Sequence, residues 1–209
     1  IINAGVIKVD GKFELNGVNL TIQVDPDTIR KPEMNEIIMD QYMSEDIKAQ
    51  FLASNSVHFT ADSFDFSSPA MIDTLFTQGT NALAYKFENV FMAKDIDSVK
   101  SITADSHSVT YKAIPSINEN GNADIWMEKI PYQDFTKGSH YNEIAGILDE
   151  NYVIEGILGG QTGEALELYD KLDLITSSDT LGRAMGDLTG EMYSNTTRRM
   201  EDVSDIFAD

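Results

Sequence analysis

The 209-residue sequence contains no cysteine and few basic residues. The absence of cysteine excludes disulfides, cysteine–zinc sites and thiol nucleophiles. Only 15 lysines and arginines stand against 35 aspartates and glutamates, which gives a formal net charge of -20. A surface this acidic is repelled by nucleic acid and by anionic lipid. We therefore expect no nucleic-acid partner.

Long hydrophobic runs are also missing. No stretch of about 18 apolar residues is present, so the sequence predicts no membrane-spanning helix. The chain begins Ile-Ile-Asn, without methionine or a segment of signal-peptide type, and we interpret it as a segment of a longer protein. Its hydrophobic share of 42% over this length is enough to bury a real core. We therefore expect one large domain or two small ones.

Motifs that carry catalysis are absent as well. The sequence contains no G-x-S-x-G, H-E-x-x-H, P-loop or G-x-G-x-x-G pattern. The three histidines, His58, His107 and His140, fall on expected strands or at a helix start, where packing and surface roles are common. Asp95 and Asp97 could offer oxygen ligands to calcium, but the twelve-residue calcium-loop pattern is missing. We predict no enzyme activity, no metal and no cofactor.

Short strands separated by glycine turns are predicted for the first part of the chain. Asp10-Gly11 and Asn16-Gly17 are turn signals between stretches of alternating apolar and polar residues. The same alternation returns in four later stretches: 57–66, 81–92, 101–113 and 118–129. These strands could form an antiparallel meander, or they could stack in register as rungs of a β-solenoid.

The apolar residues change period from two to about 3.6 from Ser139 onward, which predicts helices. The third of these helices is expected to begin near Ser178 or Asp179, both good N-cap residues. Strands followed by helices indicate an α+β layout. We divide the chain into a β-rich part, 1–130, and an acidic helical part, 131–209. Within the first part, the pattern of residues 33–52 predicts a helical insertion, although a strand stays an alternative because of their β-branched content.

The third predicted helix has an unusual glycine pattern. Gly182, Gly186 and Gly190 are spaced four apart, and each glycine in a helix interior costs roughly 1 kcal/mol relative to alanine. Close approach by another backbone is the usual reason for such a stripe, so we expect a packing face here. A parallel apolar stripe runs along the same helix: Leu181, Met185, Leu188 and Met192.

The stretch from 184 to 193 resembles the A-L-D-Q-L-S-G-E-I-Y signature of classical (type V) autotransporters. The matching positions are Ala184, Leu188, Gly190, Glu191 and Tyr193, whereas Gly186 and Asp187 depart from the pattern. Upstream, the chain is similar to the V-x-Y … N-G-x-D hairpin that precedes the helical linker of that family. The residues at those places are Val109, Tyr111, Asn120, Gly121, Asp124 and Ile125.

The resemblance implies both a fold and a function. Passengers of that family are mostly right-handed parallel β-helices, so the strands are expected to be closing rungs, with Trp126 capping their core. The helical part would be the linker to an outer-membrane β-barrel that lies outside these residues. The implied role is a non-catalytic folding nucleus at the cell surface, within an adhesin or other virulence factor.

The resemblance also implies partners. They are the protein's own barrel and a host or bacterial surface receptor. Two alternatives stay open: a self-contained acidic extracellular binding module that contacts a receptor directly, and an enzyme on a β scaffold.

Overall fold

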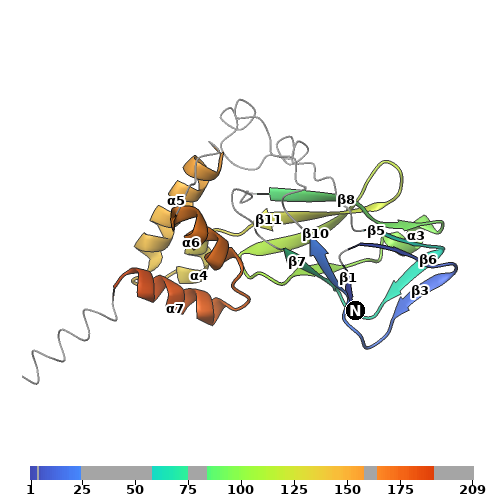
Figure 1. Cartoon of the computed structure of the whole chain (residues 1–209), viewed down its shortest axis with the longest axis horizontal. Helices are drawn as coiled ribbons and strands as arrows, with labels where there is room; N and C mark the ends of the chain where they lie inside the picture. The colour runs from blue at the N-terminus through green and yellow to red at the C-terminus, as the bar shows by residue number, and fades with distance from the viewer. Residues whose placement is uncertain (4, 25–57, 75–83, 158–163, 191–209) are drawn as a thin grey trace, which may run out of the picture.

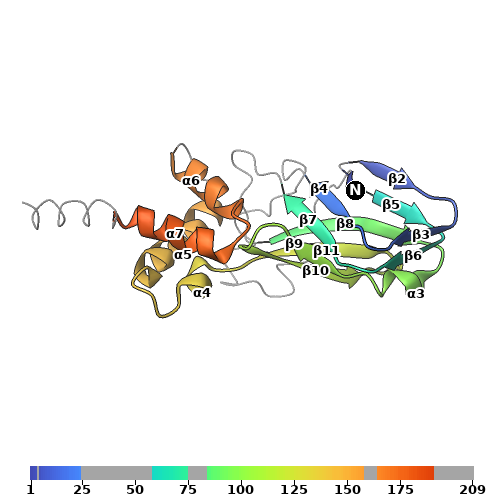
Figure 2. The same cartoon turned by 90° about the horizontal axis from the view of Figure 1, so that it is seen from below.

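Strands occupy the first part of the chain, and the helices that follow residue 131 gather at one end of them (Figures 1 and 2). The structure is a computed structural model and describes residues 1–3, 5–24, 58–74, 84–157 and 164–190. The predicted insertion at 33–52 lies outside the described residues. Within the described ranges, no helix is long and apolar enough to cross a membrane.

The strands form three sheets. A four-stranded sheet has only parallel pairs and contains, in order, β1 (Ile2–Asn3), β4 (Thr21–Val24), β7 (Ala70–Thr74) and β9 (Ala104–Ser106). A five-stranded sheet has the order β10 (Tyr111–Ile117), β11 (Ala123–Lys129), β8 (Ala84–Ala93), β5 (His58–Ala61) and β2 (Val6–Lys8). The third sheet pairs β3 (Lys12–Leu15) with β6 (Ser63–Phe66) in parallel.

All three sheets contribute to one hydrophobic core, which we call the strand core. Alternate side chains of a strand point to opposite faces, so β5 buries Phe59 and Ala61 while His58 and Thr60 stay half-buried. Phe59 stacks on Phe91 of β8 with ring centroids 5.1 Å apart. The buried members from the three sheets include Leu15, Ile22, Phe59, Phe64, Ile72, Phe91, Ile125 and Met127.

The five-stranded sheet is mixed, and its last two strands form an antiparallel hairpin. β2, β5 and β8 pair in parallel, whereas β11 pairs antiparallel with both β8 and β10. The hairpin turns at Gly121, whose φ of 78° is a conformation that glycine adopts without a Cβ clash. The side chain of Asn118 holds this turn by accepting the backbone N–H groups of Asn120 and Asn122.

The expected right-handed β-helix is corrected by this topology. Many strands pair in parallel, but three sheets, one of them made mixed by an antiparallel hairpin, enclose one core in a sandwich-type arrangement. Local alternation of apolar residues is the same in a solenoid rung and in a sandwich strand. The sequence pattern therefore could not separate the two architectures.

Most of the described helices follow β11. A short helix, α3 (Ile96–Val99), lies among the strands, and four follow them: α4 (Tyr132–Thr136), α5 (Asn142–Ile157), α6 (Glu164–Asp173) and α7 (Ser178–Leu188). They bury a second cluster, the helix core, which contains Tyr132, Ala145, Leu148, Tyr152, Tyr169, Leu172, Leu181 and Met185. Within each of α5, α6 and α7 the members are three or four residues apart, which is the predicted helical period. The division into two domains at residue 130 stays a prediction.

Helix α7 begins close to the predicted position. Its N-cap is Ser177, one residue before the predicted Ser178, and the Ser177 Oγ accepts the backbone N–H of Thr180 at 3.2 Å. This bond satisfies one of the free N–H groups in the first turn of the helix.

Candidate functional site: a buried lysine–aspartate pair at the strand–helix junction

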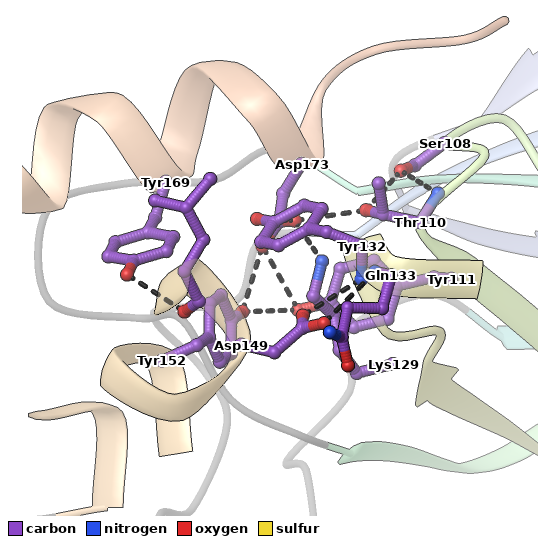
Figure 3. A network of polar contacts seen from close by, with 11 residues as sticks. Ser108, Thr110, Tyr111, Lys129, Tyr132, Gln133, Asp149, Tyr152, Tyr169 and Asp173 are labelled. Atoms are coloured by element: carbon purple, nitrogen blue, oxygen red, sulfur yellow. Dashed lines mark hydrogen bonds and ion pairs between the residues drawn. The ribbon is translucent and has the colours of Figure 1, made fainter. Parts of the chain in front are cut away.

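Asp173, the last residue of α6, lies at the centre of a buried polar network between the strands and the helices (Figure 3). Its Oδ1 accepts hydrogen bonds from the hydroxyls of Thr110 at 2.9 Å and Tyr132 at 2.8 Å. Its Oδ2 accepts from the hydroxyl of Tyr152 at 2.8 Å. The ammonium of Lys129, the last residue of β11, contacts Oδ1 directly. We call these residues, together with Tyr111, the junction network.

The lysine is as well buried as its partner. The side chains of Lys129 and Asp173 are 4% and 0% exposed. The Lys129 ammonium sits 3.8 Å from the ring centroid of Tyr132, 4.9 Å from that of Tyr152 and 5.2 Å from that of Tyr111. Aromatic faces attract a cation at such distances, more strongly when water is excluded. The three tyrosines therefore surround the ammonium with both π faces and hydroxyls.

Burial also shifts the proton affinities of these groups. Desolvation lowers the pKa of Lys129, and the neighbouring Asp173 carboxylate opposes that shift. Desolvation raises the pKa of Tyr132 well above its usual value, and the Asp173 carboxylate adds to this effect. Tyr132 therefore stays a neutral hydroxyl that can donate to the carboxylate.

A second carboxylate, Asp149 of α5, fixes the start of α4 beside the network. Its two oxygens accept the backbone N–H groups of Tyr132 at 2.8 Å and Gln133 at 3.0 Å. These two hydrogen bonds stabilise the carboxylate of Asp149 and so lower its pKa. Desolvation by burial is the larger effect, and the pKa of Asp149 is raised as a result. Asp149 thereby holds Tyr132 in the position from which its hydroxyl reaches Asp173.

The network joins the two cores. Thr110 precedes β10 and Lys129 ends β11, whereas Tyr132, Tyr152 and Asp173 belong to the helices. Losing one partner of a buried ion pair leaves an uncompensated charge and typically costs about 3–5 kcal/mol. The helices are thus attached to the ends of the strands by buried polar contacts, and losing any one charged partner would cost stability.

The predicted signature residues lie elsewhere, on and after α7. Ala184 packs against the helix core, but Leu188 is exposed. Gly190 follows the helix with a φ of 71°, so it ends the helix rather than lying in its interior. Glu191 and Tyr193 lie outside the described residues. The role of these positions as a family signature stays a prediction.

The glycine stripe makes one close contact among the described residues. A Cβ at Gly186 would lie 3.1 Å from the hydroxyl of Tyr141, whereas no described atom lies within 4 Å of one at Gly182 or Gly190. Only Gly186 therefore shows the close approach that the spacing predicts, and the partner is a side chain rather than a backbone.

Trp126 lies on β11, where it is half-buried and packs against the strand core. Its predicted role as a cap stays a prediction. In the same hairpin, the buried Asp124 accepts hydrogen bonds from the Asn89 backbone N–H and the Asn118 side chain, each at 2.8 Å. Asn89 has a φ of 54° and lies where the register between β8 and β11 shifts, so Asp124 stabilises this irregularity.

The residues considered for catalysis or calcium binding do not converge. The Nδ1 of His58 lies 3.1 Å from the Asn89 carbonyl, and the Nδ1 of His107 lies 3.5 Å from Asp73, on different sheets. His140 instead lies against the ring of Tyr141. Asp95 is the N-cap of α3. Asp97 pairs with Lys100 at 2.7 Å. Within the described part of the chain, no group of three acidic or histidine residues could hold a metal.

Sequence reasoning missed Lys129 and Asp173. One signal was available for the aspartate. Asp173 lies four residues after Tyr169 in the same helix, which places it on the buried face. A carboxylate on such a face requires a buried partner. Nothing local identified that partner as Lys129, which is 44 residues away.

The geometry defines a sandwich-type β domain whose edge carries a helical part, joined through a buried ion pair. The family model of the BigA beta sandwich domain matches residues 46–131, which include β5 to β11. This match also overturns the expectation of a β-helix. The chain is similar to BigA of Salmonella typhimurium, which is named a surface-exposed virulence protein, with 29% identity over 136 residues. The match covers 65% of this chain but only 6% of the length of BigA. No solved structure matches the chain significantly.

Proposed function

We propose that this chain is a non-catalytic structural segment of a bacterial protein displayed at the cell surface. The observation that carries the proposal is the junction network, which joins the strands to the helices through buried polar contacts. The similarity to BigA, named a surface-exposed virulence protein, supports the location at the surface. The net charge of -20 suits an exposed, highly solvated segment.

Within this role, we propose the finer function that the autotransporter resemblance implies. The segment would lie next to the membrane, with the helical part leading toward the protein's own outer-membrane β-barrel. A unit that is stable by itself could fold first and serve as the nucleus on which the rest of the passenger folds. The Lys129–Asp173 pair supports this, because it fixes the helical part to the last hairpin without help from a further segment.

The second candidate is a binding module that contacts a host or bacterial surface receptor directly. The acidic composition favours it, since complementary charge accelerates and selects association. A receptor for this module would present a basic surface. Binding of the isolated segment to receptor-bearing cells, weakened by added salt, would favour this candidate over the folding nucleus.

The test uses the full-length parent protein in its own cells. Lys129→Met removes the buried charge, and Lys112→Met, on the exposed side of β10, is the matched control. Display is measured by protease shaving of intact cells and by an antibody against the distal passenger. We expect Lys129→Met to reduce display of the folded distal passenger and Lys112→Met to leave it unchanged. Equal display from both variants would refute the folding-nucleus role.

A further inference from the structure

Lys129 and Asp173 are placed as the two reactants of an amide condensation. The lysine nitrogen touches the carboxylate, and both side chains are excluded from water. The groups come from segments 44 residues apart, a strand end and a helix end, and both are fixed by surrounding packing. Holding two reacting groups in contact removes most of the entropic barrier to their reaction.

We propose that Lys129 and Asp173 form an intramolecular isopeptide bond between Nζ and Cγ. One proton first moves from the ammonium to Oδ1, which gives an amine and a carboxylic acid. The nitrogen lone pair then attacks Cγ to form a tetrahedral intermediate. A second proton moves from the nitrogen to Oδ1, and the Cγ–Oδ1 bond breaks to release water. The sum is ammonium plus carboxylate giving amide plus water, so no oxidant, reductant or further reactant is needed.

The surrounding hydroxyls are arranged to assist both halves of this reaction (Figure 3). Tyr152 donates to Oδ2, where negative charge develops when the nitrogen attacks. Tyr132 and Thr110 donate to Oδ1, the oxygen that must leave as water. Hydrogen-bond donors on a leaving oxygen stabilise the charge that it carries while its bond to carbon breaks.

The environment also favours the reactive form of the lysine. Burial lowers the pKa of Lys129, which favours the neutral amine that can attack. A dry site has no bulk water to reverse the condensation. The product would be a covalent link from β11 to α6 across the strand–helix junction. Such a link restricts the unfolded chain and resists extension of a surface protein under force.

The test is the mass of the intact, full 209-residue chain under denaturing conditions. We expect the wild-type chain to be lighter than its sequence by one water molecule. Lys129→Arg keeps the positive charge but offers no amine that condenses, so it should have the full sequence mass. Lys112→Arg, the exposed matched control, should retain the loss of water. These measurements need no surface display, so their failure is distinct from failure of the proposed function.

Peptide mapping identifies the linked residues. An acylated Lys129 is not cleaved by trypsin, so a branched peptide should join 113–137 to 172–183. Asp10-Gly11 can also lose water by cyclising, and Lys129→Arg would not reverse that loss. A wild-type chain of full sequence mass without the branched peptide would overturn the proposal and leave an ordinary buried ion pair. A loss of water that persists in Lys129→Arg would overturn it equally.

Discussion

The strongest energetic consequence of the junction network is that a second mutation should restore part of the stability that the first one removes. Asp173→Leu removes the anion and leaves the Lys129 ammonium buried among tyrosine rings, with four hydroxyls deprived of an acceptor. Lys129→Met removes the cation but leaves Asp173 with those same four hydroxyl donors. The two single variants therefore differ in what remains unsatisfied.

The magnitudes follow from burial. Both side chains are at most 4% exposed, so solvent screening reduces the charge effects little. Breaking a buried pair costs about 3–5 kcal/mol. We expect the loss in the free energy of unfolding to lie near the upper end of that range for Asp173→Leu and near the lower end for Lys129→Met. In the double variant no uncompensated charge remains, so we expect it to be more stable than Asp173→Leu by about 2 kcal/mol.

The assay is urea unfolding of the four proteins, followed by circular dichroism, with Lys112→Met as the surface control. An isopeptide bond would be absent from all three variants of the pair, so comparing the double variant with the two single variants is valid whether or not the bond forms. Lys112→Met should change the free energy of unfolding by no more than about 0.5 kcal/mol. If the double variant were no more stable than Asp173→Leu, the two charges would not be coupled, and our description of the network would be wrong.

Three further predictions concern other positions. Gly182→Ala should stabilise the chain by up to about 1 kcal/mol through helix propensity, whereas Gly190→Ala should destabilise it by about 1–2 kcal/mol because its φ is 71°. Equal urea midpoints for these two variants would contradict this. Trp126→Ala should lower the thermal midpoint, at a cost below the about 3–5 kcal/mol of a fully buried tryptophan, because Trp126 is half-buried; an unchanged midpoint would show that its packing contributes nothing. Burial raises the pKa of Asp149 above 3.8, so wild-type stability relative to Asp149→Asn should be greatest in acid and fall as the pH rises through the raised pKa. Unfolding titrations at acid and neutral pH would show the opposite trend if hydrogen bonding, not burial, dominated.

Much of the local structure could be predicted because local patterns cause it. The Asn120-Gly121 turn formed where glycine permits a positive φ, and helix α7 began within one residue of a predicted N-cap. The glycine stripe shows the limit of this reasoning. Gly190 fits the helical spacing, yet it lies after the last helical turn, because the same residue type also terminates helices.

The sequence by itself determined the order of strands before helices, the turns, the apolar faces and the acidic charge, since each depends on neighbouring residues. Only the tertiary structure decided how the strands pair, and the β-helix expectation failed because alternation does not specify a partner strand. The meeting of Lys129 with Asp173 was decided in the same way. Residues 44 positions apart come together only when a strand end and a helix end pack against each other, and no local sequence pattern specifies that contact.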